Sequence, residues 1–399
     1  MAWTIGSDWT KNPATVTISE YMSRLVVAFI LASGLFGQQN GKLQLHFMDV
    51  GQGDGAVLIS PKGQVVLFDA GEDMKRKSCV KPLDYLRQLG INKIDYVVVS
   101  HYHFDHIGCL PEVLAQFPLS GTAYDRGASY TGATYEKYLT AVGEQRKSAE
   151  TGQMIRLDEG TSSEVDLSVV ALNGAGIATT NENDLSMAIL LTFGAFKAEI
   201  GGDLSGTDTG AYKDIETTVA PLVGRLDVYK VHHHCSSFSS NAMWLATTQP
   251  TVGIISTGDG NDYGHPAPDC LARLHAQNVT SYWTETGAGA APQAGTDTVG
   301  GNVVVEVAPG AGMYTVRTSS GSSTTFAVAG ANGDVHVAVI PPANVTTIPR
   351  YAWSKRSAVY HYSTCALLGR MSGDRRVEGD TPPEGKQLHQ NCPQLAPRR

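Results

Sequence analysis

The chain has 399 residues, 42% of them hydrophobic, and a formal net charge of −8. This content can bury a full core, so a disordered chain is excluded as the default, and the length allows two domains or one large domain with an appendage. The net negative charge does not favour non-specific binding to the phosphate backbone of nucleic acids, although it allows a small local basic patch.

The first 40 residues are typical of a targeting segment. Residues 25–37, LVVAFILASGLFG, form an apolar run that follows Arg24. This run is too short to span a bilayer comfortably, and its flanks predict a secretory signal peptide; a buried core helix or strand is the alternative. Met22 resembles a natural start, which would make residues 1–21 a mis-called extension. We expect an exported protein, periplasmic or secreted, with no integral membrane segment in the mature chain.

A strand–helix–strand pattern follows this segment. Residues 42–60 predict two strands around a Gly-rich turn, and residues 64–71 predict a third strand that ends in a turn. Residues 80–90 have apolar side chains at helical spacing and end on a glycine, which predicts a helix with a glycine C-cap. Residues 93–100, KIDYVVVS, predict a buried strand, so the strand–helix–strand stretch forms a βαβ unit.

The remaining elements define four predicted parts of the chain. Strands are expected at 187–193, 196–203, 226–231 and 251–257, a helix at 269–277 and a hairpin near 302–320. The predicted parts are a signal peptide with a possible extension at 1–40, a main α/β domain at 41–320, a linker at 321–348 and a small Cys/His module at 349–399. The six cysteines are too few for a disulfide scaffold, and nothing requires the first four, Cys79, Cys109, Cys235 and Cys270, to pair.

A dense group of potential metal ligands follows the strand at 93–100. The motif H-x-H-x-D-H is formed by His101, His103, Asp105 and His106. Imidazoles and carboxylates suit zinc, manganese or iron. Alternate residues of an extended backbone face the same way, so His101 and His103 can hold one ion while Asp105 and His106 reach a second. Two such ions can generate hydroxide at neutral pH and clamp substrate oxygens. The preceding strand, the spacing and Gly108 favour a metal centre over a chance surface cluster of histidines.

Further candidate ligands follow later strands. Asp203 ends the strand at 196–203, where a carboxylate could bridge two ions, although an aspartate there is more often a simple turn residue. The triplet His232, His233 and His234 follows the strand at 226–231, and a satisfied core histidine is the alternative interpretation. His265 lies in a Gly/Pro turn after the strand at 251–257. The recurrence of a ligand type after each strand carries more weight than any single instance.

These segments together resemble the metallo-β-lactamase superfamily and, within it, the hydrolase domain of the ComEC-type competence proteins. The likeness is carried by LHFMDVGQGDGAVLIS, VVLFDAG, VVVSHYHFDHIG, NENDLSMAILL, GGDL, KVHHHCSS and YGHP, in this order. The resemblance implies an α/β fold, the αββα metallo-β-lactamase sandwich, with two divalent metal ions between the sheets. Zinc is the first expectation for these ions and manganese is the second.

The resemblance also implies roles for individual residues. The expected metal ligands are His101, His103, Asp105, His106, Asp203 and one of His233 and His234, whose neighbour would contact substrate. His265 matches the family's Gly-His-Pro and would lie on the substrate side or act as a ligand, and Asn183 lies where many members have another histidine ligand. The expected catalytic residues are Asp105, His234, His265 and Asn183. Asp49, Gln52 and Asp54 resemble a buried polar loop that supports the site, with simple turn residues as the alternative.

Two features depart from the ComEC-type pattern. That group usually has Gly-His-His-Gly-Ser, whereas this chain has bulkier residues at both glycine positions, His232 and Cys235. The backbone geometry and the access of substrate at this loop are therefore open. The multi-span membrane channel of that group has no counterpart in this sequence. We interpret the chain as a free-standing exported relative, so DNA uptake is not inherited with the fold.

The C-terminal module resembles small Ada-type metal-binding modules. Its four candidate ligands are His361, Cys365, His389 and Cys392, in the pattern H-x3-C…H-x2-C, which could hold one structural zinc. A disulfide between Cys365 and Cys392 is an equal alternative in an exported protein, and neither arrangement is the third. The basic residues of this module could also bring a polyanion to the metal centre.

The sequence as a whole predicts an exported metal-dependent hydrolase. A two-metal phosphodiesterase or nuclease is the first hypothesis, with a small phosphodiester or a nucleic acid as substrate. A hydrolase of carboxylic esters, lactones or β-lactams on the same centre is the second. A non-catalytic metal-binding accessory protein is the third, and the complete set of ligands argues against it. The fold does not settle the substrate.

Overall fold

The computed structural model describes residues 39–71, 77–330, 351–354, 358–362, 376–379, 383 and 385–388. It divides into two compact units, residues 1–334 and 335–399. The predicted signal peptide lies outside the described residues except for its last two positions, and so do residues 331–348 of the predicted linker. Within the described part of the chain, no helix combines the length and the apolar character that crossing a bilayer requires.

Two β-sheets form the centre of the first unit. The first sheet has the order β17-β16-β15-β1-β2-β3-β4-β5-β6, and the second has the order β14-β13-β12-β11-β10-β9-β8-β7. The strands of the first sheet are β1 (Leu43–Phe47), β2 (Ala56–Ile59), β3 (Val65–Phe68), β4 (Ile94–Val98), β5 (Leu119–Asp125), β6 (Arg146–Ser148), β15 (Val303–Val307), β16 (Met313–Thr318) and β17 (Ser323–Ala327). Those of the second are β7 (Met154–Leu157), β8 (Val165–Ala171), β9 (Ala188–Phe193), β10 (Phe196–Ile200), β11 (Val228–Lys230), β12 (Val252–Ile255), β13 (Thr280–Trp283) and β14 (Asp297–Val299).

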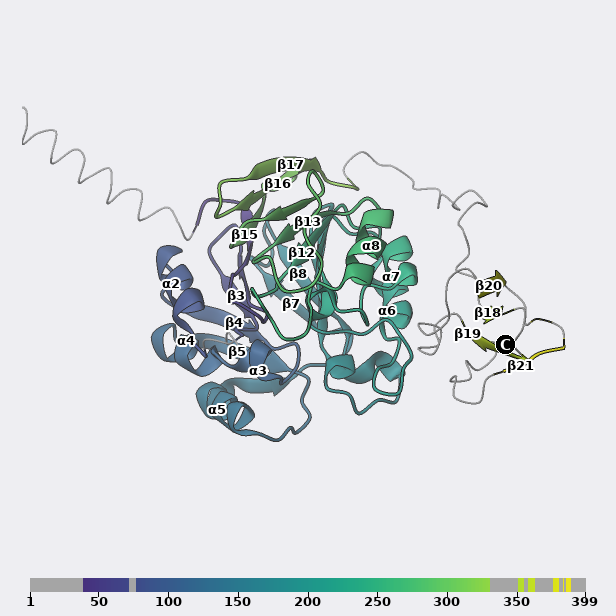
Figure 1. The fold of residues 1–399 in the computed structure, drawn as a ribbon. Coiled ribbons are helices and arrows are strands. Elements are labelled where there is room, and N and C mark those ends of the chain that lie inside the picture. Colours follow the sequence, from purple (N-terminus) through teal and green to yellow (C-terminus); the bar gives the residue numbers. More distant parts are fainter. Residues whose placement is uncertain are drawn as a thin grey trace, which may run out of the picture. The chain divides into compact units, whose positions relative to one another are not determined.

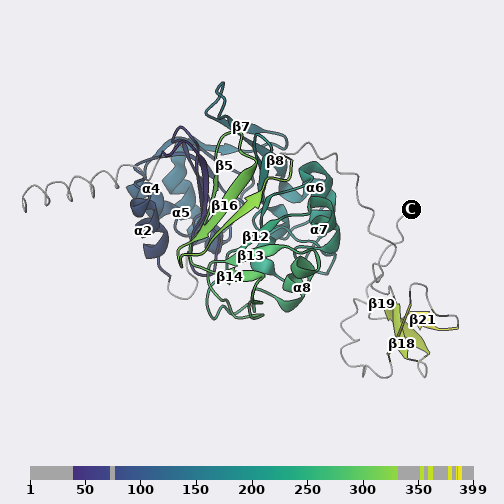
Figure 2. The ribbon, with the colours of Figure 1, turned by 90° about the horizontal axis from the view of Figure 1, so that it is seen from above.

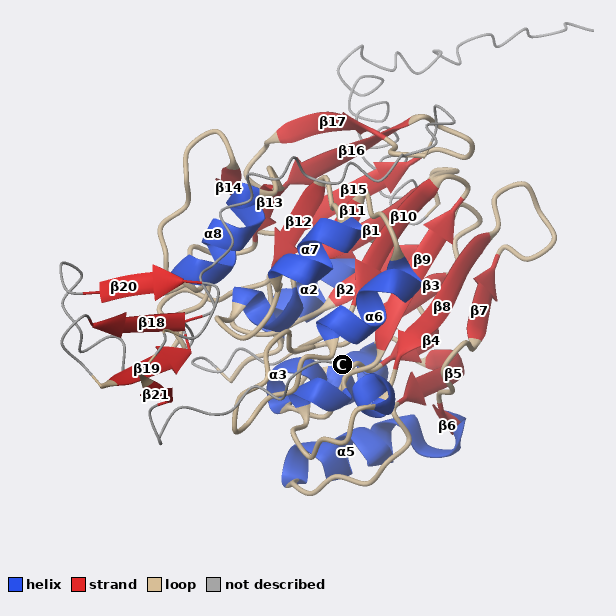
Figure 3. Ribbon diagram, turned by 90° about the vertical axis from the view of Figure 1, so that its right-hand side faces the viewer, coloured by secondary structure: helices blue, strands red, loops and turns tan. Residues whose placement is uncertain are grey.

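Helices cover the outer face of each sheet. The helices on the first sheet are α2 (Val80–Gln88), α3 (Phe104–Ile107), α4 (Leu110–Gln116) and α5 (Ala133–Val142), and those on the second are α6 (Glu216–Val223), α7 (Ala242–Thr248) and α8 (Pro268–Ala276). Figures 1 and 2 show the two helical layers on opposite sides of the sheets, and Figure 3 shows the same arrangement by secondary structure. The described residues of this unit also include four short 3-10 helices, η1 (Gly143–Gln145), η2 (Asn173–Gly176), η3 (Asn183–Leu185) and η4 (His232–Cys235). The predicted αββα sandwich is confirmed.

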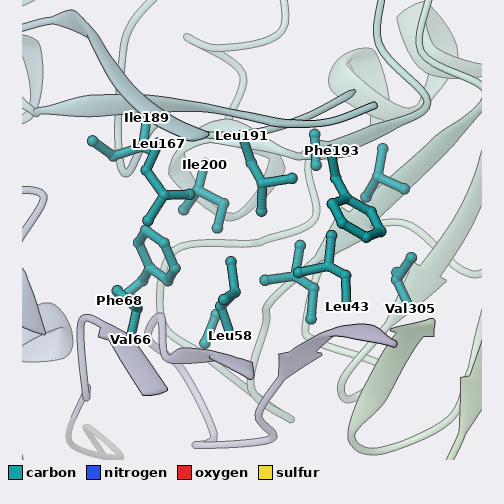
Figure 4. Close-up of a cluster of buried hydrophobic side chains, with 14 of the residues drawn as sticks. Leu43, Leu58, Val66, Phe68, Leu167, Ile189, Leu191, Phe193, Ile200 and Val305 are labelled. Carbon is teal, nitrogen blue, oxygen red and sulfur yellow. The ribbon is translucent and has the colours of Figure 1, made fainter. Parts of the chain in front are cut away.

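The layers follow from the two-residue repeat of the strands. On β3, Val66 and Phe68 pack into the core between the sheets, whereas Val65 and Leu67 pack against the helices. All four side chains are buried because both faces of the sheet are covered, which is why the segment is a continuous apolar run without polar alternation. Figure 4 shows Phe68 among side chains of the opposite sheet, such as Leu167 and Ile189.

The predicted βαβ unit is present, and the first sheet extends further than the sequence suggested. Strands β3 and β4 pair in parallel, with Val66 opposite Tyr96, and helix α2 connects them. At the other edge, β17 pairs antiparallel with β16, with Met313 opposite Ala327. The sheet therefore continues past residue 320, into the stretch for which the sequence predicts a linker with one or two strands.

The second unit contains a small sheet with the order β20-β18-β19-β21. Its strands are β18 (Tyr351–Ser354), β19 (Val359–Tyr362), β20 (Arg376–Gly379) and β21 (Gln387–Leu388). His361 belongs to β19, where the backbone alone is described, and Cys365, His389 and Cys392 lie outside the described residues. The choice between a zinc site and a disulfide in this unit therefore stays a prediction.

His46 on β1 should make the stability of the first unit depend on pH. Its buried imidazole accepts a hydrogen bond at Nδ1 from the Tyr85 hydroxyl, 2.9 Å away, when the imidazole is neutral. Burial lowers the pKa of His46 from 6.5 to about 4. The unfolded chain therefore binds the proton first, so this contribution is complete above the unfolded pKa of 6.5 and is lost as the pH falls toward 4.

The size of this effect follows from the shift in pKa. A difference of this size corresponds to about 3 kcal/mol of unfolding free energy. The His46→Leu variant has no imidazole to protonate at this position, so it should not lose this part of its unfolding free energy as the pH falls. The difference in unfolding free energy between the wild type and the variant should therefore change by about 3 kcal/mol between about pH 7 and pH 4 in urea titrations. A difference that stays constant across this range would contradict the assignment.

Candidate metal centre

The predicted ligands gather where several strands of the two sheets end. His101 follows β4, Asp203 follows β10, the histidine triplet follows β11, and His265 lies in the loop after β12. These loops line a cavity of about 530 Å³. The sequence-predicted residues that line it are His103, Asp105, Asn183, Asp203, His233, His234 and His265. Aromatic side chains that the sequence did not single out, Phe104, Tyr212, Phe238 and Tyr263, complete much of its wall.

The carboxylate of Asp203 lies between four imidazoles. Its Oδ1 is 3.3 Å from Nε2 of His106 and 3.7 Å from Nε2 of His234. Its Oδ2 is 3.8 Å from Nε2 of His101 and 3.7 Å from Nε2 of His233. Each carboxylate oxygen therefore faces a different pair of histidines, which is the arrangement that a carboxylate bridging two cations requires.

The remaining motif residues extend the cluster on both sides of Asp203. Two sets of three residues each bring their potential ligand atoms within 4.8 Å of one another. The first set is His101, His106 and Asp203, and the second is Asp105, His106 and His234. Nδ1 of His103 is 3.0 Å from Nε2 of His101, and Oδ2 of Asp105 is 3.4 Å from Nε2 of His234. Two motif histidines therefore contact Asp203 directly, and His103 and Asp105 join the cluster through His101 and His234.

Buried polar atoms without hydrogen-bond partners indicate that this cluster suits divalent cations. Among the described residues, Nε2 of His106, Nε2 of His234 and Oδ1 of Asp203 are buried and make no hydrogen bond. Each such atom costs about 1–3 kcal/mol, and native proteins rarely leave several side by side. Imidazole lone pairs and carboxylate oxygens are ligands for zinc and manganese, so bound cations would satisfy all three atoms.

Hydrogen bonds on the far side of two imidazoles fix how they face Asp203. His106 donates from Nδ1 to Oδ2 of Asp69 at 2.9 Å, and His234 donates from Nδ1 to the carbonyl oxygen of Ser256 at 3.0 Å. In a neutral imidazole that donates from Nδ1, the lone pair lies on Nε2, which is the atom directed at Asp203, so these hydrogen bonds orient Nε2 for a cation that displaces its proton. Asp69 is in turn held by Ser100, whose hydroxyl donates to it at 2.6 Å.

The charges of the cluster oppose the effect of burial. Burial by itself would raise the pKa of Asp203, but His106, His233 and His234 hold it well below its ordinary range. Burial lowers the pKa of His101 well below its usual value, so this imidazole is neutral and able to act as a ligand. The carboxylate is ionised and the imidazole is neutral, which are the protonation states that metal binding requires.

Comparison with known proteins agrees with this architecture. The family model of the metallo-beta-lactamase superfamily matches residues 56–259, just over half of the chain. The chain belongs to the metallo-β-lactamase superfamily. The match includes the H-x-H-x-D-H motif, Asp203 and the histidine triplet.

The match to each curated relative covers only part of that relative's length. Recombination protein 2 of Haemophilus influenzae is 27% identical over 234 residues, which is 58% of this chain and 26% of that protein. ComE operon protein 3 of Bacillus subtilis is 23% identical over 253 residues, 59% of this chain and 31% of that protein. The chain therefore spans less than a third of these relatives. Among solved structures, the metallo-β-lactamase fold protein YhfI of Bacillus subtilis is 11% identical with a TM-score of 0.40, covering 66% of this chain and all of that one.

Glycines in the Gly-rich turn and after β3 let the backbone of this superfamily member approach the motif closely. A Cβ atom at Gly71 would lie 2.0 Å from the carbonyl oxygen of Asp105, and one at Gly53 would lie 2.4 Å from the same atom. That oxygen accepts a hydrogen bond from the amide of Asp54 at 2.9 Å. Larger residues at these two positions would push the Gly-rich turn and the segment after β3 away from the H-x-H-x-D-H loop. The glycines therefore allow both segments to pack against the backbone of this loop.

The polar residues of the turn at 49–54 make contacts outside the turn, and one of them, Asp54, contacts the cluster. Oδ2 of Asp54 is 2.8 Å from Nζ of Lys230, and its Oδ1 is 3.2 Å from Nδ1 of His234. Gln52 accepts a hydrogen bond from the amide of Gly258 at 3.0 Å. Asp49 pairs with Lys81 at 2.8 Å. These contacts show that the three polar residues are more than turn residues.

Asn183 and His265 both reach the cavity, whereas His232 does not line it. Nδ2 of Asn183 is 3.2 Å from Nε2 of His233. The His265 ring lies 5.6 Å from that of His233, and its backbone is fixed by two hydrogen bonds to the Asn261 side chain. His232 is instead buried between Glu216, 2.8 Å from its Nδ1, and Glu199, 3.2 Å from its Nε2.

The histidine loop after β11 has an unusual backbone. His233, His234 and Cys235 have φ values of 49°, 53° and 60°, which lie in the left-handed region that glycine adopts freely. Each non-glycine residue in this conformation costs about 1–2 kcal/mol. Of the two positions that depart from the Gly-His-His-Gly-Ser pattern, His232 and Cys235, only Cys235 has a positive φ, so the cost of a side chain in place of glycine falls on Cys235.

The structure pairs all four cysteines that the sequence left unpaired. Cys79 is bonded to Cys109, and Cys235 is bonded to Cys270. The sequence does not require these four cysteines to pair but allows an exported protein one or two bridges, and the packing of α2 on α4 and of the histidine loop on α8 brings each pair to bonding distance. No spacing pattern of these cysteines signals the pairing.

Glu182 is a supporting residue that sequence reasoning missed. Its Oε1 accepts hydrogen bonds from the amide of Tyr102, at 2.9 Å, and from Nε of Arg126, at 2.9 Å. Its Oε2 accepts from Nη2 of Arg126 at 2.6 Å. Glu182 thus connects the peptide between His101 and His103 to the segment that carries Asn183. It carried no sequence signal beyond its place beside Asn183 in NENDLS.

Removing Glu182 should destabilise the first unit. Arg126 is 4% exposed, so Glu182→Leu would leave a buried guanidinium without its partner, at a cost of about 3–5 kcal/mol. The double variant Glu182→Leu/Arg126→Leu removes both charges and should recover a large part of that loss. Urea unfolding measures both changes, and a double variant less stable than Glu182→Leu alone would contradict this account.

Proposed function

We propose that this metallo-β-lactamase superfamily hydrolase is a two-metal phosphodiesterase, acting as a nuclease on polymeric substrates. The observation that carries the proposal is the position of Asp203, whose two oxygens face separate pairs of imidazoles. A bridged pair of cations suits phosphodiester cleavage because it can stabilise both the attacking and the leaving oxygen of an in-line displacement.

We assign the described residues to two cation positions that share Asp203. The ligands of one cation would be His101, His103 and His233, and the ligands of the other would be Asp105, His106 and His234. When bound, zinc or manganese ions would supply an acidified water and positive charge on the substrate oxygens. Both His233 and His234 are assigned as ligands because the Nε2 atoms of both face Asp203, at 3.7 Å.

Other cavity residues would orient substrate and move protons. Burial and the neighbouring His234 and His233 lower the pKa of His265 to about 3, so its imidazole is neutral near neutral pH. His265 lines the cavity, and a neutral imidazole can accept a hydrogen bond from a substrate hydroxyl or a water there. The Asn183 side chain also lines the cavity, and its Nδ2 can donate to a substrate oxygen.

The relatives support nucleic acid as the substrate class. One of them is named a recombination protein and another a competence protein. The four aromatic side chains of the cavity also suit nucleic-acid bases, since rings stack on bases of any sequence. Two of the four, Phe238 and Tyr263, are 38% and 55% exposed and so remain free to contact a ligand.

Hydrolysis of a neutral ester, lactone or β-lactam is the second candidate. None of the described residues that line the cavity is a lysine or an arginine. Outside the cation positions, the cavity therefore lacks a positive side chain that would select an anionic substrate. A cavity wall of this kind can accept an uncharged carbonyl substrate as readily as an anionic phosphodiester.

A hydrolysis panel separates the two candidates. The purified full chain, loaded with Zn²⁺ or Mn²⁺, is tested on bis-p-nitrophenyl phosphate, single-stranded DNA, plasmid DNA, a homoserine lactone and nitrocefin. We expect turnover of the phosphodiester and of DNA, and a strong reduction of both in an Asp203→Asn variant. Turnover of the lactone or nitrocefin alone would overturn the phosphodiesterase proposal and favour the second candidate.

We also propose that the protein is exported. The apolar run at 25–37 supports this, and so do the two disulfides, since such bonds persist in oxidising compartments. N-terminal sequencing of the protein from a secreting host tests the proposal. A mature chain that starts near Gln38 is expected, whereas an intact chain in the cytosolic fraction would contradict export.

A further inference from the structure

The histidine loop joins the candidate metal centre directly to a disulfide. His233 and His234 face Asp203, and the next residue, Cys235, is bonded to Cys270 in helix α8. Both cysteines are fully buried. Helix α8 is itself anchored, because Leu271 and Leu274 pack into the core under the second helical layer. The covalent bond therefore connects the metal-facing residues to a fixed part of the fold.

The loop adopts a backbone conformation that its residues disfavour. Three consecutive non-glycine residues, 233 to 235, have positive φ. Hydrogen bonds hold the edges of this stretch: the amide of His233 donates to Gly202 at 3.1 Å, and the amide of Ala267 donates to the carbonyl of Cys235 at 2.8 Å. The bond to Cys270 holds the third residue itself, at a position where glycine would adopt the same φ without strain.

We propose that Cys235 and Cys270 are positioning residues for the metal centre. Their disulfide holds residues 233–235 in the left-handed conformation that directs both histidines at Asp203, and metal affinity depends on it. In this chain the disulfide replaces the conformational freedom of a glycine at position 235. The proposal rests on the two-metal centre proposed above.

The second disulfide provides a matched control. Cys109 lies three residues after His106, so it too follows a metal-binding loop. Its backbone has an ordinary φ of −91°, and its amide donates to Ala70 at 2.8 Å. The two bonds close loops of similar length, with sequence separations of 30 and 35 residues. The two disulfides should therefore restrict the conformations of the unfolded chain to a similar extent. Only the Cys235–Cys270 disulfide is attached to a backbone segment with positive φ.

Three double variants of the full chain test the proposal. Cys235→Ala/Cys270→Ala removes the bond and leaves a strained residue at 235. Cys235→Gly/Cys270→Ala removes the same bond but places glycine there. Cys79→Ala/Cys109→Ala removes the other bond. Zn²⁺ affinity is measured by competition with a chromogenic chelator, and urea unfolding reports the stability of each variant without metal.

The expected result separates conformation from simple stability. Zn²⁺ affinity should fall about 10- to 100-fold in Cys235→Ala/Cys270→Ala, the range for loss of a group that orients a ligand. It should stay close to the wild-type value in the glycine variant and in Cys79→Ala/Cys109→Ala, although both lose a cross-link. If the alanine variant does not fold, the glycine variant still decides, because it should fold and bind Zn²⁺ as the wild type does.

Two results would overturn the proposal. Equal affinity in the alanine and glycine variants, both retained or both lost, would show that the disulfide does not act through the backbone conformation. An equal loss in Cys79→Ala/Cys109→Ala would assign the effect to general stability. Failure of the wild type to bind Zn²⁺ would instead overturn the proposed metal centre, and this inference with it.

Discussion

Asparagine in place of Asp203 should reduce turnover by about a hundredfold to a thousandfold, the range for loss of one group that stabilises developing charge. The substitution keeps the size of the side chain but removes its negative charge. The two carboxylate oxygens face four imidazole nitrogens at 3.3–3.8 Å, so charge is what this position supplies. An amide is a much weaker bridge between cations, and bound metal should fall from about two equivalents to one or none.

Asp227→Asn is the matched control for this prediction. Asp227 is also a buried carboxylate, and it lies directly before β11, the strand that leads to the histidine loop. It accepts backbone hydrogen bonds from Lys197 at 2.9 Å and from Ala329 at 2.7 Å, and it faces no imidazole in the metal cluster. The control should lose stability but keep its metal and its turnover. Equal loss of turnover in both variants would assign the effect to damage of the second sheet.

Removing the metal with a chelator should abolish hydrolysis and destabilise the first unit. A ligand that binds only the folded state adds about 4 kcal/mol when its concentration is a thousandfold above its dissociation constant. The buried Nε2 atoms of His106 and His234 and Oδ1 of Asp203 would lose their cation partners. The midpoint of thermal unfolding should therefore fall by several degrees, and added Zn²⁺ or Mn²⁺ should restore it. An unchanged midpoint after complete metal removal would contradict a metal centre at this cluster.

Metal removal should also be coupled to proton uptake. Burial lowers the pKa of His234, but Asp203 and Asp54 raise it to about 10 in the absence of cations, and Asp203 raises the pKa of His106 well above its usual value. Both imidazoles therefore take up protons when the cations leave, and metal affinity should weaken as the pH falls. Calorimetric titrations in buffers of different ionisation enthalpy measure this exchange, and proton release on metal removal would contradict it.

Local patterns in the sequence were sufficient for the layered fold and for the motif. The runs that become β1 to β4 are short and apolar because their strands are covered on both faces, and this signal does not depend on distant residues. The four residues of H-x-H-x-D-H lie within six positions, so one loop delivers all of them. By contrast, β5 is mostly half-exposed and shows no regular alternation, and no strand is predicted there from local patterns.

The pairing between distant loops was decided by the tertiary structure alone. Glu182 and Arg126 are 56 positions apart, and Cys235 and Cys270 are 35 apart. Nothing in the composition of either segment indicates its partner, since packing of helices and strands against the sheets sets these distances. The sequence likewise left open which histidine of the triplet faces Asp203, and the structure turns two of them toward it. By itself the sequence determined the family, the fold and the ligand types. The orientation of the ligands depended on a left-handed loop and a disulfide, because backbone conformation there is set by contacts far away along the chain.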